Sequence, residues 1–177
     1  MVREVKRSRR PRWPVGLTVE TVRNGRGIVA LRRFRRGALI CEVTGKRVTS
    51  ETVWAYWDRD PRLGANCFRC DDDHYIDPDG EIGAFANHSC NPNAGIVKRG
   101  RRLFLKALAP IAAGEEVTHD YSTLLGADDV WTMRCNCGEA ACRRVVRNVR
   151  RLPPATLRRY RRLGIVPDFI LATRPVR

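Results

Sequence analysis

The arrangement of the seven cysteines constrains this chain more than any other feature of its sequence. Residues 1–12 carry charges where a secretion signal needs an apolar stretch, so we expect a protein that is not secreted. Disulfide frameworks are rare in proteins that stay in reducing compartments, and the thiols are therefore expected to bind metal or to act as thiolates. The cysteines are Cys41, Cys67, Cys70, Cys90, Cys135, Cys137 and Cys142.

Three of the cysteines form the run Cys135-Asn-Cys137-Gly-Glu-Ala-Ala-Cys142, in which the glycine permits a tight turn between ligands. Structural zinc is bound by four ligands in a closed tetrahedral site, and the run supplies three. Cys90 is the best candidate for the fourth ligand. The separate pair Cys67 and Cys70 has the spacing of half a second site, but two thiols in a loop or core have it too, so both interpretations stay open.

The net charge of +15 is concentrated at the two ends of the chain. Residues 1–12 and 143–177 together hold 17 basic and two acidic residues, whereas residues 13–142 hold 17 of each sign. A neutral body with basic ends predicts that the ends contact a polyanion such as DNA or RNA. The alternative is solvated surface charge produced by codon bias, because the chain has 30 arginines and four lysines.

Short alternating segments separated by turn residues predict a mainly β protein with one core. Thr49-Ser50 is a helix N-cap signal before residues 51–57, and apolar spacing predicts a second helix over 155–163 that ends at Gly164. No apolar run approaches about 18 residues, so no membrane span is expected. Strands are expected over residues 16–23, 28–31, 38–43, 74–76, 102–108 and 116–121.

Four motifs in order carry a resemblance to a known family. Asn87-His-Ser-Cys-Asn-Pro-Asn93, then Gly114-Glu-Glu-Val-Thr-His-Asp-Tyr121, then the cysteine run resemble the SET-domain protein lysine methyltransferases that have a post-SET zinc module. Gly25-Arg-Gly27 resembles the first motif of that family. The resemblance covers about residues 15–145 and points to a small single-domain member.

The resemblance implies the SET fold, which consists of small curved, β-clip-like sheets with a knot-like crossing. In that crossing the Asn-His segment passes beside the strand that carries the catalytic tyrosine. The implied organisation is a basic N-terminal arm, a SET domain, a post-SET zinc module and a basic C-terminal helix and tail. Their boundaries are expected at residues 1–13, 14–124, 125–146 and 147–177.

The resemblance also implies an activity and a set of site residues. Members of the family transfer a methyl group from S-adenosylmethionine to a lysine ε-amine, and Tyr121 corresponds to the catalytic tyrosine. The implied zinc site is structural and consists of Cys90, Cys135, Cys137 and Cys142. The implied cofactor-binding residues are Asn24, Gly25, Arg26, Gly27, Asn87, His88 and Tyr121.

Three positions depart from the family pattern. Val43 stands where a tyrosine commonly lines the lysine channel, and Tyr75 is the candidate substitute. His119, two residues before Tyr121, stands where the family commonly has the phenylalanine or tyrosine that influences how many methyl groups are added. An imidazole that binds a channel water favours lower methylation states. Ala84 replaces an arginine that is usual before Phe85.

The acidic stretch 71–81 lies where the family places an insert that shapes one wall of the peptide groove. Its carboxylates favour a Lys/Arg-rich substrate, such as a histone or a histone-like nucleoid protein. A solvated loop, or a partner for the basic ends, is the alternative. The expected location is chromatin in a eukaryote, or the cytoplasm and nucleoid in a bacterium. The oligomeric state stays open.

A competing interpretation is a non-catalytic chromatin-binding or nucleoid-binding module that keeps the fold and the zinc. Asn87, His88 and Tyr121 occurring together favour the enzyme, because a retired enzyme has no need of all three. A zinc-ribbon-like nucleic-acid binder is a poorer fit, since it leaves the neutral body and the ordered motifs unexplained.

Overall fold

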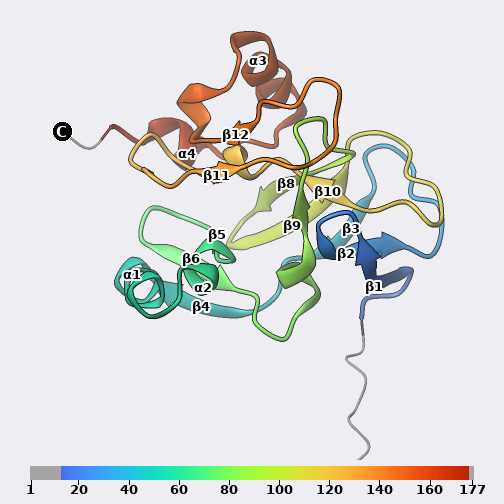
Figure 1. Ribbon diagram of the computed structural model, residues 1–177, viewed down its shortest axis with the longest axis horizontal. Helices are drawn as coiled ribbons and strands as arrows, with labels where there is room; N and C mark the ends of the chain where they lie inside the picture. The colour runs from blue at the N-terminus through green and yellow to red at the C-terminus, as the bar shows by residue number, and fades with distance from the viewer. Residues whose placement is uncertain (1–12, 176–177) are drawn as a thin grey trace, which may run out of the picture.

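The computed structural model describes residues 13–175 and is built mainly of short β-strands (Figure 1). The strands are β1 (Leu17–Val22), β2 (Gly25–Ala30), β3 (Leu39–Glu42), β4 (Lys46–Thr49), β5 (Phe68–Arg69), β6 (His74–Asp77), β7 (Asn87–His88), β8 (Ala94–Arg99), β9 (Arg102–Ala107), β10 (Thr118–His119), β11 (Met133–Arg134) and β12 (Val145–Val146). The α-helices are α1 (Ser50–Arg59), α2 (Pro61–Ala65), α3 (Pro154–Leu163) and α4 (Asp168–Ala172), and 3-10 turns cover Ile82–Phe85, Tyr121–Thr123 and Val149–Arg151. The predicted mainly β class is confirmed.

The strands form several small sheets instead of one large one. Two sheets have three antiparallel strands, in the orders β3-β9-β8 and β4-β6-β5. Strands β1 and β2 pair as a hairpin, and β11 pairs with β12. The remaining pair, β7 with β10, is parallel, so two segments far apart in the sequence run side by side.

The predicted helices are confirmed, and their ends have local causes. The Thr49 side chain accepts a hydrogen bond from the Thr52 backbone N–H and so caps α1. Helix α3 ends at Gly164, whose φ of +68° is a left-handed conformation that a residue without Cβ adopts at little cost. Sequence patterns missed β8, because four consecutive buried residues replace the alternation typical of a strand with one solvated face.

The predicted strand over residues 116–121 is shorter in the structure. Only Thr118–His119 are in β10, and Tyr121 begins a 3-10 turn. The Asp120 side chain accepts the Ser122 backbone N–H at 3.1 Å, which caps the turn and ends the strand. The turn leaves Tyr121 at the end of the strand, beside the Asn-His segment.

The C-terminal helices pack on the outside of the β8–β9 hairpin (Figure 1). Tyr160, Ile165 and Ile170 are fully buried there with Val97 of β8. A Cβ on Gly95 would lie 2.6 Å from the Ile165 side chain, so close packing requires glycine at this position of β8. Within the described residues, no helix is long and apolar enough to cross a membrane.

Candidate active site

The parallel pair of β7 and β10 brings two predicted motifs together. Asn87 lies opposite Thr118, and His88 lies opposite His119. Successive side chains of a strand point to opposite faces, so Thr118 and His119 face different sides of the pair. Each side has a cavity: Thr118 lines one, and His119 lines the other.

Tyr121 lies immediately beyond this strand pair, and its hydroxyl and its backbone N–H are both held by hydrogen bonds. The hydroxyl donates a hydrogen bond to the Ala86 carbonyl at 2.9 Å, and the backbone N–H donates to His88 Nδ1 at 3.2 Å. Burial, together with the Glu116 carboxylate, raises the pKa of Tyr121 to about 12. The phenol is therefore protonated at neutral pH and serves as a hydrogen-bond donor.

The larger cavity, about 480 Å³, lies on the Tyr121 side and combines aromatic walls with acidic residues. Tyr75 lines this cavity together with Tyr121 and His119. Val43 itself is buried in the core. The other aromatic residues of the wall are Trp54, Trp57, Phe68 and Trp131, and the carboxylates are Asp58, Asp72, Asp128 and Asp129.

His119 is a buried imidazole, and neither of its ring nitrogens has a hydrogen-bond partner among the described residues. Its ring stacks on Phe68 with centroids 5.6 Å apart and lies 5.0 Å from the Tyr121 ring. Burial lowers the pKa of His119 to about 3, so the ring is neutral and offers one donor and one acceptor. A buried polar group of this kind needs a partner, and the cavity can hold one.

The second cavity, about 390 Å³, lies on the other side of the strand pair. It is polar, with Asn24, His88 and Glu116 among its lining residues. Asn87 Nδ2 donates to the Arg26 carbonyl at 3.0 Å and to Glu116 Oε1 at 2.7 Å, which ties β7 to the β2 hairpin. Amide, carboxylate and backbone groups of this kind match a ligand that carries amino, hydroxyl and carboxylate groups.

Glycine is required at the two hairpin positions for different structural reasons. Gly25 has a φ of +95°, which the turn requires. At Gly27 a Cβ would lie 2.7 Å from Val22 Cγ2 and 2.9 Å from Asn87 Nδ2, and it would also collide with Glu116. Gly27 therefore allows the hairpin to pack closely against Asn87 and Glu116. Arg26, between them, lies over the Phe85 ring with its guanidinium carbon 4.6 Å from the ring centroid.

Both ring nitrogens of His88 are engaged inside the protein. Nδ1 accepts the Tyr121 backbone N–H, so the neutral ring carries its proton on Nε2, which lies 3.3 Å from Cys90 Sγ and donates to it. Burial lowers the pKa of His88 to about 4 and keeps the ring neutral. The side chain thus connects Tyr121 to Cys90, and only the backbone of His88 is left to contact a ligand.

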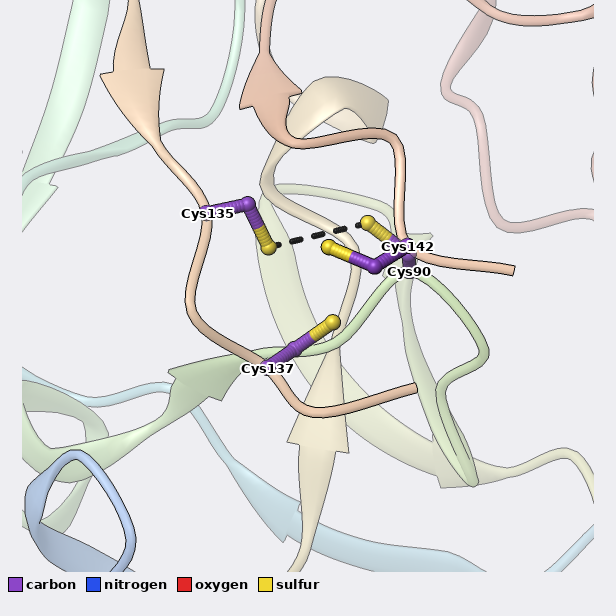
Figure 2. A group of neighbouring side chains, drawn as sticks. All are labelled: Cys90, Cys135, Cys137 and Cys142. Carbon is purple, nitrogen blue, oxygen red and sulfur yellow. Dashed lines mark hydrogen bonds between the residues drawn. The ribbon is translucent and has the colours of Figure 1, made fainter. Parts of the chain in front are cut away.

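The four cysteines named from the sequence form one cluster (Figure 2). Their Sγ atoms all lie within 4.8 Å of one another, and Cys90 Sγ is 3.7 Å from Cys135 Sγ. Tetrahedral zinc with Zn–S bonds of about 2.3 Å separates its sulfurs by about 3.8 Å. Backbone N–H groups of Arg143 and Arg144 also donate to Cys90 and Cys142, as in thiolate sites. The four residues therefore fit structural zinc.

Cys67 and Cys70 are not part of this cluster. Their thiols donate to the Leu63 and His74 carbonyls at 3.4 and 3.3 Å. Burial raises the pKa of Cys67 to about 12, which disfavours the thiolate form. Among the described residues the only cluster of potential metal ligands is the four-cysteine one, so the pair behaves as two protonated thiols, of which Cys67 lines the aromatic cavity.

Sequence reasoning missed a buried carboxylate beside the candidate tyrosine. Asp120 is fully buried, and its oxygens accept from Arg143 at 2.7 Å and from the Tyr160 hydroxyl at 3.0 Å. Arg143 directly follows the last cysteine, and Tyr160 lies in α3. The position of Asp120, between His119 and Tyr121, is the only sequence signal that could have drawn attention to it. The carboxylate links the cysteine segment and the C-terminal helix to the end of β10.

Comparisons with known proteins agree with this arrangement. A family model described as the SET domain matches residues 25–122. A Saccharomyces cerevisiae protein named histone-lysine N-methyltransferase, H3 lysine-4 specific, is 35% identical over 126 residues, covering 66% of this chain and 12% of its own length. A Mycosarcoma maydis protein of the same name is 32% identical over 127 residues, or 67% of this chain and 9% of its own.

A third relative is the Caenorhabditis elegans protein named probable histone-lysine N-methyltransferase lin-59, 35% identical over 124 residues. These cover 66% of this chain and 9% of that protein, so the chain spans about a tenth of the length of the relatives it matches. The matched segment contains the hairpin glycines, the Asn-His segment and Tyr121; His88 lines the polar cavity, and Tyr121 lines the aromatic one. The chain belongs to the SET domain family.

Proposed function

We propose that the protein is an S-adenosylmethionine-dependent protein-lysine N-methyltransferase. The observation that carries this proposal is a protonated tyrosine hydroxyl at the end of a strand pair that has a polar cavity on one side and an aromatic, acidic cavity on the other. The names of the relatives, all histone-lysine N-methyltransferases, support the same activity.

The polar cavity is the proposed cofactor site. S-adenosylmethionine supplies an electrophilic methyl group when it is bound. The residues proposed to hold it are Asn24, Gly25, Arg26, Gly27, Asn87, His88 and Tyr121. Gly27 lets Asn87 and Glu116 pack directly against the hairpin beside this cavity, and His88 contributes its backbone because its ring is engaged with Tyr121 and Cys90.

The aromatic cavity is the proposed lysine site. A free lysine has a pKa near 10.4 and must lose its proton before it can attack a methyl group. Apolar walls such as Phe68 lower the pKa of an amine that enters, because burial disfavours its charged form. The Tyr121 hydroxyl and the Ala86 carbonyl, already 2.9 Å apart, are the groups proposed to orient the amine lone pair. Tyr75 is proposed to line the channel.

We propose that the four cysteines bind one structural zinc ion, which holds the segment after β11 against the Asn-His segment. All four ligand positions are then taken by thiolates, so the metal has no open position for chemistry. The post-SET module is expected to cover residues 125–146, with the SET domain before it.

His119 is proposed to bind a water in the lysine channel through one of its two unpartnered ring nitrogens. A water held there occupies space that a second or third methyl group needs, so we expect mainly mono- and dimethyllysine products. Replacing His119 with phenylalanine keeps the stacking on Phe68 and removes both ring nitrogens. We expect the trimethyl fraction to rise several-fold in His119→Phe, measured by mass spectrometry; mainly trimethyllysine from the wild type would contradict the role of His119.

The neutral state of His119 also predicts how stability depends on pH. Its pKa is about 3 in the folded protein and near 6.5 in the unfolded chain, so between these values the unfolded chain binds a proton that the folded chain does not. Stability is therefore lost as the pH falls below 6.5. Between pH 7 and 5, urea unfolding should show a loss about 2 kcal/mol smaller in His119→Phe than in the wild type. Equal losses would show that His119 titrates normally.

The proposed substrate is a Lys/Arg-rich protein, with histones first, and the proposed location is chromatin. The aromatic cavity has four aspartates and one arginine among its lining residues, so its field attracts a basic peptide. The relatives' names specify histones. Contact with DNA through the basic ends stays a prediction: Arg158, Arg159, Arg161 and Arg162 of α3 are exposed, and residues 1–12 lie outside the described part.

The test is transfer of labelled methyl from S-adenosylmethionine by the zinc-replete protein to core histones and to bacterial nucleoid proteins. Label on histone lysines is expected. Label on nucleoid proteins alone would show that the substrates are nucleoid proteins and not histones. A zinc-replete protein that does not bind S-adenosylmethionine and transfers no label would instead be a non-catalytic chromatin-binding module. Calorimetric titration with S-adenosylmethionine separates these outcomes.

A further inference from the structure

The lysines of the chain are few, and their positions differ. Three of the four lie in strands: Lys46 in β4, Lys98 in β8 and Lys106 in β9. Each of these strands pairs with a neighbour, so none of the three lysines can enter a cavity as part of an extended, unpaired segment. Lys6, in Met-Val-Arg-Glu-Val-Lys-Arg-Ser-Arg-Arg-Pro-Arg, is the one lysine that precedes the described residues.

The aromatic cavity has the opposite charge. Its charged lining consists of Asp58, Asp72, Asp128 and Asp129 against a single arginine, Arg69. Arg69 is already paired with Asp128, at 2.9 Å. Asp58 and Asp72 are exposed and have no ion-pair partner among residues 13–175. The cavity therefore presents unneutralised carboxylates beside Trp54 and Trp57.

The first described residue links these two features. Trp13 packs edge-on against Phe85, with ring centroids 5.8 Å apart. The next residue, Ala86, lines the aromatic cavity, and its carbonyl accepts the Tyr121 hydroxyl. Lys6 precedes Trp13 by seven residues, which span about 23 Å when extended. The basic segment is therefore attached at Trp13, which packs on the residue that precedes Ala86 of the cavity wall.

We propose that residues 1–12 bind in the aromatic cavity, which offers them an acidic groove, and that Lys6 is methylated by the protein itself. This inference rests on the proposed function. The five arginines of the segment complement the groove carboxylates and hold the segment in place. The Lys6 amine loses a proton to water, and its lone pair forms the new N–C bond. The methyl–sulfur bond breaks with its electrons on sulfur, giving S-adenosylhomocysteine.

The test incubates the purified full chain with zinc, S-adenosylmethionine and core histones in one tube, followed by digestion and mass spectrometry. We expect methyl groups on Lys6 at a level at least 10-fold above any on Lys46, Lys98 or Lys106. Lys6→Arg should remove the methylation of the chain and leave histone methylation at or above the wild-type rate, because a competing substrate is gone.

Charge variants show whether the groove selects the segment. Asp58→Asn with Asp72→Asn should slow Lys6 methylation several-fold at low salt, and the matched exposed variant Asp79→Asn, outside the groove, should not. Histones methylated while Lys6 stays unmodified would overturn the inference and leave the proposed function standing. Methylation of neither would overturn the proposed function and the inference with it.

Discussion

Replacing Tyr121 with phenylalanine is expected to slow methyl transfer by at least about 100-fold while the protein stays folded. Removing one preorganised donor from a reacting site costs about 100- to 1,000-fold in rate. The fold loses only the hydrogen bond from the hydroxyl to the Ala86 carbonyl, about 1 kcal/mol. The measurement is the initial rate of methyl transfer to core histones, with thermal melting of both proteins as the folding control.

A matched tyrosine provides the comparison for this variant. The Tyr56 hydroxyl donates to Asp77 at 3.0 Å, and the residue does not line either cavity. Tyr56→Phe loses the same kind of group, so its rate should stay within about twofold of the wild type if only the placement of Tyr121 matters. A Tyr121→Phe protein that kept more than a tenth of the wild-type rate would show that its hydroxyl does not contact the reacting groups.

Replacing Cys135 with serine is expected to remove the zinc and to destabilise the protein. The Cys135 thiol lies 3.7 Å from that of Cys90, and the proposed metal joins segments that are 45 residues apart. Losing a structural metal is among the changes that cost more than about 4 kcal/mol. That loss corresponds to a melting temperature about 10 °C lower in a chain of this size. The measurement is zinc per chain together with the melting temperature.

Cys67→Ser is the matched control, since Cys67 donates to the Leu63 carbonyl and lies outside the cluster. It should keep one zinc per chain and melt close to the wild type. The cofactor affinity of Cys135→Ser should fall as well, because His88 connects Cys90 to the backbone of Tyr121. A Cys135→Ser protein with unchanged zinc content and melting temperature would exclude the four-cysteine site.

Local sequence patterns predicted the parts of the site that depend on local chemistry. All four members of the cluster were identified from the cysteine run and Cys90, because thiolate ligands are recognisable by residue type and spacing. The N-cap at Thr49 and the stop at Gly164 placed both long helices for similarly local reasons. The Asn-His segment and Tyr121 were recognised as motifs, and the structure pairs their strands.

Contacts between distant residues could not be predicted in this way. Asp120 and Tyr160 are 40 residues apart, and nothing in either segment indicates that a helix hydroxyl meets a buried carboxylate. The family resemblance implies a cofactor-binding role for His88, but only the folded structure shows that its ring is hydrogen-bonded to the Tyr121 backbone and to Cys90. Tyr75 reaches the aromatic cavity because β6 packs between β4 and β5, a register that is set by the whole sheet.

The most direct test of the proposed function is mass spectrometry of core histones after incubation with the zinc-replete protein and S-adenosylmethionine. We expect added methyl groups on lysine side chains, dependent on the cofactor and nearly absent with Tyr121→Phe. Histones without added methyl groups, from a folded protein that holds its zinc and binds S-adenosylmethionine, would contradict histone-lysine methylation as the function of this chain.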